Sequence, residues 1–273
     1  MSERMDQKAR WNGPGAKAWI TNRDLLDAMF QPFRAILAEA VRPGEAVLDV
    51  GCGTGGTTLA VASAVGPAGA VTGVDISEPM IAVARERAAA EGSPARFLAA
   101  DAQDHAFDAG AYDRLVSRFG VMFFADPVRA FANLRRACRP GGAMLFVAWR
   151  GRDENPFMTA ADRAAAPLLL QPPEPRAATG QFAFADADYV TGILADAGWR
   201  DAAIERLDVT CSFPAAELPR YAEHMGPLAP TLGALDPGAR EPIVKAILDG
   251  YAPFVSGDVV SYTAACWAIR GRA

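Results

Sequence analysis

Short apolar runs alternate with amphipathic stretches through the first half of the chain. The apolar runs predict strands at 46–50, 70–74, 95–99, 112–117 and 143–149. Between them, the spacing of apolar residues predicts helices over about 54–64, 78–90 and 126–138. The 78–90 helix has an N-cap at Ser77, Pro79 in its first turn and Gly92 after its end. Strands that alternate with helices of this length indicate an α/β fold with a doubly wound parallel sheet.

The rest of the chain predicts helical additions to this sheet. Residues 14–40 have the apolar spacing of a helix, which Pro32 kinks or splits. After Trp149 we expect a helix at 186–197, strands at 203–213 and 259–269, and proline-rich segments between them. The predicted organisation is an N-terminal helical cover over 1–43 and one domain over 44–273. Its insertions, at about 151–184 and 214–256, are expected to form lids.

Composition narrows the classes of function. The chain has 273 residues with 27 Lys and Arg against 32 Asp and Glu, so it lacks the basic footprint of nucleic-acid binding. No apolar run approaches the roughly 20 residues of a membrane span, and the polar first residues predict a cytoplasmic protein. Two histidines and four scattered cysteines predict reduced core thiols and no metal site. A small molecule, a protein or a lipid headgroup stays possible as a ligand.

A glycine-rich turn follows the first predicted strand in the string VLDVGCGTGG, residues 47–56. Gly51, Gly53 and Gly56 satisfy G-x-G-x-x-G at a strand-to-helix junction. There, glycines let a ligand approach the backbone, and the helix start offers free N–H groups. Dinucleotide enzymes share this pattern, so the turn alone does not identify the ligand.

Three acidic residues stand at the ends of three successive predicted strands. Asp49 would repel a pyrophosphate but suits a cationic amino group, and Asp75 is placed to accept hydrogen bonds from ribose hydroxyls. Asp101 could accept from an exocyclic adenine amine. An ammonium, a ribose and an adenine without phosphates describe S-adenosylmethionine (SAM) better than NAD.

Five strings run in order over residues 44–149: VLDVGCGTGG, VTGVDISEPMI, FLAADAQD, YDRLVSRFGVMFFADP and LRRACRPGGAMLFVAW. Through them the chain resembles the class I SAM-dependent methyltransferases, of the type found in ubiquinone and menaquinone biosynthesis. The resemblance implies a Rossmann-like, seven-stranded sheet with an antiparallel last strand. It also implies SAM as the cofactor and S-adenosylhomocysteine (SAH) as its product. Insertions rich in alanine, proline and leucine favour a small, partly apolar acceptor.

The resemblance also implies roles for single residues. Asp49, with the backbone of Gly51 and Gly53, would hold the methionine part of SAM, Asp75 its ribose and Asp101 its adenine amine. The other cofactor candidates are Trp11, Thr54, Ile76, Met80, Ala102, Gln103 and Ser117. Core packing is the alternative for Ile76 and Met80. For Trp11 and Trp19, expected to cover SAM, the alternative is anchoring of the N-terminal helix.

The candidates for contacting the acceptor are Arg118, Phe119, Met122 and His224. Arg118 could pair with a carboxylate or phosphate, with a surface ion pair as the alternative. His224 could act as a base, with a solvated helix histidine as the alternative. We name no catalytic residue, because in-line methyl transfer can depend mainly on positioning the acceptor and excluding water.

Two other functions stay open. One is a SAM-binding enzyme or regulator that transfers no methyl group, and the other is an NAD-dependent oxidoreductase that uses the same glycine turn.

Overall fold

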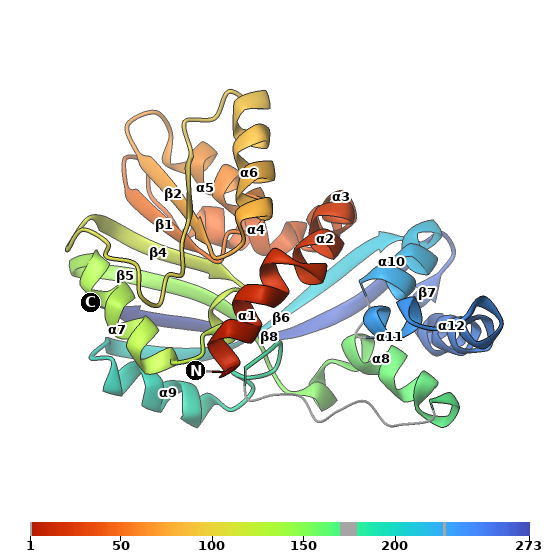
Figure 1. Cartoon of the computed structure of the whole chain (residues 1–273). Helices are drawn as coiled ribbons and strands as arrows, with labels where there is room; N and C mark the ends of the chain where they lie inside the picture. Colours follow the sequence, from red (N-terminus) through yellow and green to blue (C-terminus); the bar gives the residue numbers. More distant parts are fainter. Residues whose placement is uncertain (1, 170–178, 226–227) are drawn as a thin grey trace.

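The computed structural model describes residues 2–169, 179–225 and 228–273. Its centre is one sheet with the strand order β3-β2-β1-β4-β5-β8-β6 (Figure 1). The parallel strands are β1 (Ala46–Val50), β2 (Ala70–Asp75), β3 (Arg96–Ala99), β4 (Tyr112–Arg118) and β5 (Cys138–Trp149). Antiparallel to its neighbours, β8 (Val259–Arg272) lies between β5 and β6 (Arg200–Pro214), and the short β7 (Val255–Ser256) pairs with it. The predicted α/β fold with an antiparallel last strand is confirmed.

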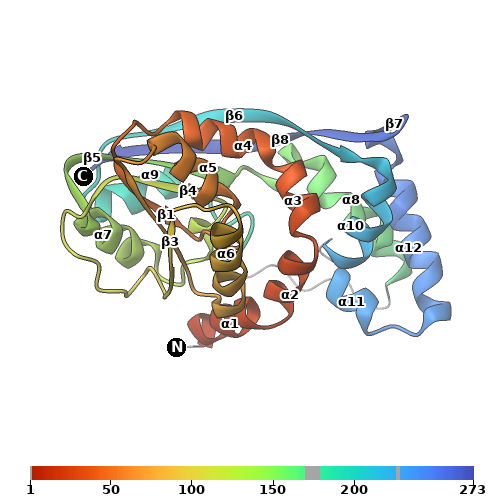
Figure 2. The same ribbon diagram turned by 90° about the horizontal axis from the view of Figure 1, so that it is seen from above.

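Helices cover both faces of the sheet (Figures 1 and 2). One face carries α4 (Gln31–Glu39), α5 (Gly56–Val65) and α6 (Glu78–Ala90), and the other carries α7 (Pro127–Ala137) and α9 (Ala187–Asp196). The predicted start of α6 holds, since the Ser77 hydroxyl accepts a hydrogen bond from the Met80 N–H at 3.4 Å. None of the helices in the described ranges is long and apolar enough to cross a membrane.

The fifth strand starts earlier than its apolar run predicts. Pairing with β4 begins at Tyr112 and Cys138 and shifts register before it resumes at Arg114 and Ala143. This irregularity accommodates the Pro140-Gly141-Gly142 segment, which lies outside the strand that the apolar run predicts.

The predicted helical structure over 14–40 is confirmed, but it is divided into three helices, with breaks at Asn22 and Phe30, and a further helix precedes them. In chain order they are α1 (Ser2–Asn12), α2 (Pro14–Thr21), α3 (Arg23–Met29) and α4. Pro32 does not itself break a helix, because it lies in the first turn of α4, where no backbone N–H donor is needed. Met29 of α3 and Phe33 of α4 are fully buried in the main core, so these two helices share the core of the sheet.

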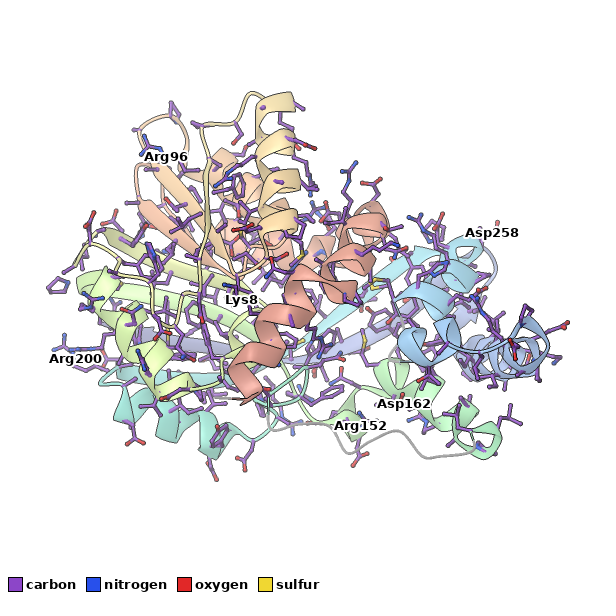
Figure 3. The ribbon with its side chains drawn as sticks, viewed as in Figure 1. Lys8, Arg96, Arg152, Asp162, Arg200 and Asp258 are labelled. Carbon is purple, nitrogen blue, oxygen red and sulfur yellow. The ribbon has the colours of Figure 1, made fainter. Side chains whose placement is uncertain are left out.

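The two predicted insertions pack against each other as one helical lobe. The lobe consists of α8 (Pro156–Ala165), α10 (Leu218–His224), α11 (Ala229–Gly233) and α12 (Pro237–Tyr251). It lies at the far end of the long β6–β8 ribbon, whose two ends are marked in Figure 3 by Arg200 and Asp258. The predicted proline cluster at 171–175 lies outside the described residues.

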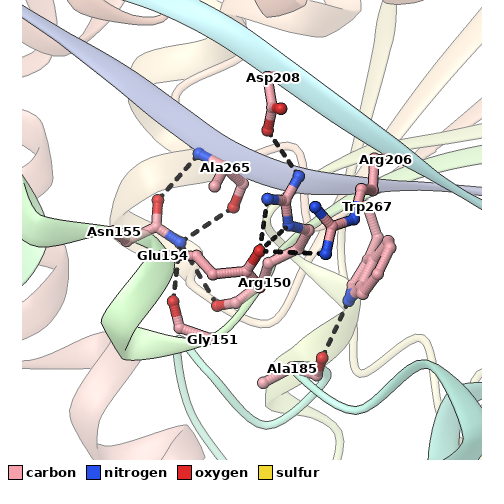
Figure 4. Close-up of polar contacts among 9 residues, drawn as sticks. All are labelled: Arg150, Gly151, Glu154, Asn155, Ala185, Arg206, Asp208, Ala265 and Trp267. Carbon is pink, nitrogen blue, oxygen red and sulfur yellow. Dashed lines mark hydrogen bonds and ion pairs between the residues drawn. The ribbon is translucent and has the colours of Figure 1, made fainter.

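A polar network fixes the point where the chain leaves the sheet for the lobe (Figure 4). The Arg150 side chain, directly after β5, is only 5% exposed and donates to Glu154 and to Asp208 of β6, both at 2.5 Å. Asn155 exchanges two hydrogen bonds with the Ala265 backbone of β8, at 2.9 and 3.0 Å. Charge-assisted bonds of this kind tie the root of the lobe to three strands.

Candidate functional site

A pocket opens at the carboxyl ends of the parallel strands. Its wall combines the glycine turn after β1, the loops after β2, β3 and β4, and side chains of α1 and α2. The predicted site residues that it brings together are Trp11, Gly51, Gly53, Thr54, Asp75, Ile76, Met80, Asp101, Ala102, Gln103, Arg118 and Phe119.

The glycine turn forms the floor of this pocket. Gly51 and Gly53 have φ angles of +70° and +56°, a backbone conformation that strains other residues. A Cβ on Gly51 would lie 2.7 Å from the Cα of Gly120, so the ends of β1 and β4 approach backbone to backbone. The turn therefore exposes main chain to any molecule in the pocket.

Asp75 is held in place at the end of β2. Its Oδ2 accepts from the Gly53 N–H at 2.8 Å, and its Oδ1 accepts from the Ser77 N–H at 2.9 Å. Burial raises the pKa of this carboxyl, and the two backbone bonds oppose that shift. Each oxygen keeps capacity to accept a further bond, so the carboxylate can receive two hydroxyls from the pocket side.

Asp49 lies behind the pocket wall rather than in it. The residue is 1% exposed, and its Oδ2 accepts from the Thr58 hydroxyl at 2.6 Å. Its Oδ1 is buried without a hydrogen-bond partner among the described residues. Burial raises the pKa of this carboxyl to about 6, against the bond from Thr58 and the charge of Arg118.

Three other predicted residues lie away from the pocket wall. The hydroxyl of Ser117 is fully buried and donates to the Val50 carbonyl at 2.6 Å, so it supports the floor from below. Met122 packs in the main core. His224 is exposed at the end of α10, which agrees with a solvated helix histidine.

The loop after β3 is braced by its own side chains. Asp101 accepts from the Gln103 N–H at 2.9 Å, and the Gln103 Oε1 accepts from the Asp126 N–H at 2.9 Å. Gln103 thus joins the loop after β3 to the start of α7, in addition to lining the pocket.

Helix α1 supplies polar contacts that the sequence did not indicate. Asn12 donates to the Ile76 carbonyl at 3.1 Å and accepts from the Glu78 N–H at 3.0 Å. Gln7 lines the pocket, donates to the Thr179 hydroxyl and accepts from the Trp11 indole, both at 3.1 Å. Isolated amide side chains on a polar helix carry no pattern that would have identified them.

Few of the described residues that line the pocket have ionisable side chains. The described residues that line it include Asp75, Asp101, Cys52 and Arg118 but no histidine, lysine or tyrosine. Burial, together with the charges of Asp75 and Asp49, raises the pKa of the Cys52 thiol well above its usual range. Cys52 therefore stays a neutral thiol, and all four cysteines are buried and free.

Comparisons with known proteins agree with this geometry. Residues 47–142 match a family model described as a methyltransferase domain. The demethylmenaquinone methyltransferase of Staphylococcus aureus is 37% identical over 105 residues, which are 38% of this chain and 43% of the relative. The chain thus matches less than half the length of this curated relative.

Two solved structures share the fold at low identity. Phosphoethanolamine N-methyltransferase 2 of Haemonchus contortus, solved with SAH, superposes with a TM-score of 0.57 at 17% identity, over 96% of this chain and 58% of that one. The [4+2]-cyclase SpnF superposes with a TM-score of 0.55 at 21% identity, over 88% and 80% of the two chains. The strand order, the glycine turn and the matched domain lead to one conclusion. Residues 47–142 therefore match a methyltransferase domain, on a fold shared with SAM-dependent methyltransferases.

Proposed function

We propose that the protein transfers the methyl group of SAM to a small, partly apolar acceptor. The proposal depends on the position of Asp75. This residue shares one pocket with the glycine turn and Asp101, and backbone N–H groups hold both of its carboxylate oxygens. When bound, SAM supplies a methyl group already activated on a sulfonium. The chain has to bind SAM and the acceptor, orient them for the transfer and exclude water.

The described residues fit SAM part by part. Asp75 offers two acceptors to the ribose hydroxyls, and Asp101 offers one to the adenine amine. Ile76 and Met80 supply apolar surface for the adenine ring, and the backbone at Gly53 approaches without a side chain. Trp11 and Trp19 cover this part of the pocket from α1 and α2.

Aromatic side chains support an acceptor with apolar surface. Phe119, Phe123 and Phe124 line the pocket after β4, and Trp11 packs edge-on against Phe123 at 5.1 Å between ring centres. The S. aureus relative is named for a quinone-type acceptor, but its match covers too little of this chain to transfer that substrate. The cytoplasmic location expected from the polar first residues stays a prediction.

The similarity to SpnF supports a second candidate function. Its name states a cyclase on the same fold, so a SAM-binding enzyme that moves no methyl group is a real alternative. Assays with panels of small apolar acceptors separate the two. Release of SAH that depends on an acceptor supports methyl transfer, whereas turnover without SAH release supports the alternative.

Calorimetric titration with SAM, SAH and NAD tests the cofactor assignment. We expect SAM and SAH to bind and NAD to fail, and NAD binding without SAM binding would overturn the proposal.

Asp75→Ala should weaken SAH binding by about 1–3 kcal/mol, because two hydrogen bonds to a charged group are lost. A matched control is Asp113→Ala, which removes a carboxylate that accepts from the Ala46 N–H at the opposite end of the sheet. Unchanged SAH affinity in Asp75→Ala would contradict the assigned role.

A further inference from the structure

Gln7 of α1 is a buried amide in the pocket wall, and its neighbours fix its orientation. The residue is 7% exposed and lines the pocket. Its Oε1 accepts from the Trp11 indole N–H at 3.1 Å, and an indole nitrogen can only donate. The amide oxygen therefore has to face Trp11, and the amide nitrogen Nε2 is directed away from it. There Nε2 donates to the Thr179 hydroxyl at 3.1 Å.

This orientation leaves one N–H of the amide without an acceptor. The amide nitrogen of glutamine carries two N–H donors, and the bond to Thr179 uses one of them. Among the described residues, only Thr179 accepts from Nε2 of Gln7. Buried polar groups in folded proteins nearly always have a hydrogen-bond partner. Since Gln7 lines the pocket, a molecule bound there can supply the missing acceptor.

The contacts of the amide place it on the side of the pocket that the chain after β4 forms. Thr179 precedes Gly180, whose N–H donates to the Met122 carbonyl at 3.2 Å. Trp11 packs edge-on against Phe123, with 5.1 Å between the ring centres. The acidic residues that we assign to the ribose and the adenine lie at or after the ends of β2 and β3 instead. The remaining N–H therefore belongs to the side of the pocket where we place the acceptor.

The surroundings of this donor are largely aromatic, because Trp11, Trp19 and Phe123 line the same pocket. A hydrogen bond is stronger where apolar groups exclude water. We propose that Gln7 is a specificity-determining residue, which donates from Nε2 to a carbonyl or carboxylate oxygen of the acceptor. The inference rests on the proposed function and deepens it, since it narrows the acceptor to partly apolar molecules that carry such an oxygen.

Gln7→Glu tests the inference, because it replaces the N–H donor by an oxygen at nearly constant size. A carboxylate can still accept from the Trp11 indole and from the Thr179 hydroxyl, so the contacts that anchor α1 are retained. We expect the variant to bind SAH within about twofold of the wild type. Lys8→Ala, at the exposed neighbouring position of α1, is the control and should change no affinity.

Three probes with a phenyl ring on a short alkyl chain report on the donor, in calorimetric titrations of the full chain loaded with SAH. Benzylacetone offers a carbonyl oxygen and hydrocinnamate a carboxylate, whereas phenylpropylamine, as its ammonium, offers donors only. In the wild type, we expect an oxygen probe to bind at least about tenfold more tightly than the amine. The tighter of the two oxygen probes identifies a neutral or an anionic acceptor. Gln7→Glu should abolish the preference for oxygen.

The outcomes separate the inference from the proposed function. Equal affinity for the three probes, including no binding of any, overturns the inference while SAH binding stands. A preference for oxygen that persists in Gln7→Glu also overturns it, since Gln7 would then only anchor α1. A loss of SAH affinity in this variant would assign Gln7 to the cofactor instead. Should Gln7→Glu not fold, Gln7→Met, which has no donor, takes its place. If the wild-type protein does not bind SAH, the proposed function fails as well.

Discussion

The Asp49 carboxyl shows how one buried ionisable residue can lower the stability of the fold. Burial raises its pKa to about 6, above the value of about 3.9 that an unfolded aspartate has. The folded state therefore binds this proton more tightly than the unfolded state. The stability of the fold falls as the pH rises from about 4 to about 6, and the cost is fully present above that range.

Asp49→Asn should consequently raise the free energy of unfolding at pH 7 by about 1–3 kcal/mol. The gain should vanish near pH 4, where the wild-type carboxyl is also neutral. Urea unfolding at the two pH values measures the difference, with the exposed Asp24→Asn as a control that should change little. A gain of equal size at pH 4 and pH 7 would exclude titration of Asp49 as its cause.

At the residue scale, the sequence predicted which residues gather at the pocket better than it predicted where their side chains point. Twelve of its candidates line one pocket, because glycines and strand-end acids are tied to the topology of a parallel sheet. Ser117 and Met122 turned inward instead, one to hydrogen-bond the Val50 carbonyl and the other into the core. Which way a side chain points in the last residues of a strand and in the loop after it depends on tertiary packing, and residue type does not encode it.

At the element scale, α1 is tied to the chain that follows β2 at the edge of the pocket. Asn12 bridges the Ile76 carbonyl and the Glu78 N–H, which belong to the loop and first turn after β2. Neutral hydrogen bonds at an exposed position are worth about 1 kcal/mol each or less. We therefore expect these two hydrogen bonds to slow ligand exchange without preventing it.

Asn12→Ala should speed the release of SAH about fivefold, since most changes in affinity act through the dissociation rate. Stopped-flow fluorescence can follow the release, because Trp11 and Trp19 line the pocket. Lys8→Ala, on the same helix and marked in Figure 3, is the control and should leave the rate unchanged. An unaltered rate in Asn12→Ala would show that α1 does not limit exchange.

The N-terminal helices show why the boundaries between helices could not be predicted from the sequence. Neither Asn22 nor Phe30, where α3 and α4 begin, provides a side-chain cap. The break at Phe30 follows from packing, because its ring meets Phe119 at 5.3 Å and Trp149 at 6.2 Å. These contacts join residues distant in sequence. The strands, by contrast, were predictable, since parallel strands buried on both faces read as apolar runs.

At the scale of the whole molecule, the helical lobe packs around aromatic residues that belong to the main core but do not line the pocket. Phe157 of α8 is fully buried in the lobe and stacks on Tyr262 of β8 with 3.9 Å between ring centres. It also packs against Tyr221 and Tyr251, from α10 and α12. None of these residues lines the pocket. The lobe unites the two insertions, and their mutual packing could not be read from either segment alone.

Phe157→Ala should lower the free energy of unfolding by about 3–5 kcal/mol, through lost burial and the cavity that remains. SAH affinity should stay within about twofold as long as the protein is folded. Denaturant unfolding and calorimetry measure the two quantities, and Tyr189→Ala, a half-exposed aromatic on α9, should cost little. A parallel loss of SAH affinity would show that the lobe also shapes the pocket.

The close approach of Gly51 and Gly120 limits how this protein can acquire new specificity. A Cβ on Gly120 would lie 2.6 Å from the Val50 carbonyl and 2.8 Å from the Cα of Gly51, so neither position tolerates a side chain without parting two strands. Substitutions meant to change the acceptor that we propose are therefore better placed in the aromatic residues after β4 and in helices α1 and α2, which line the same pocket. Directed evolution on this scaffold would do best to vary those positions and to leave the floor unchanged.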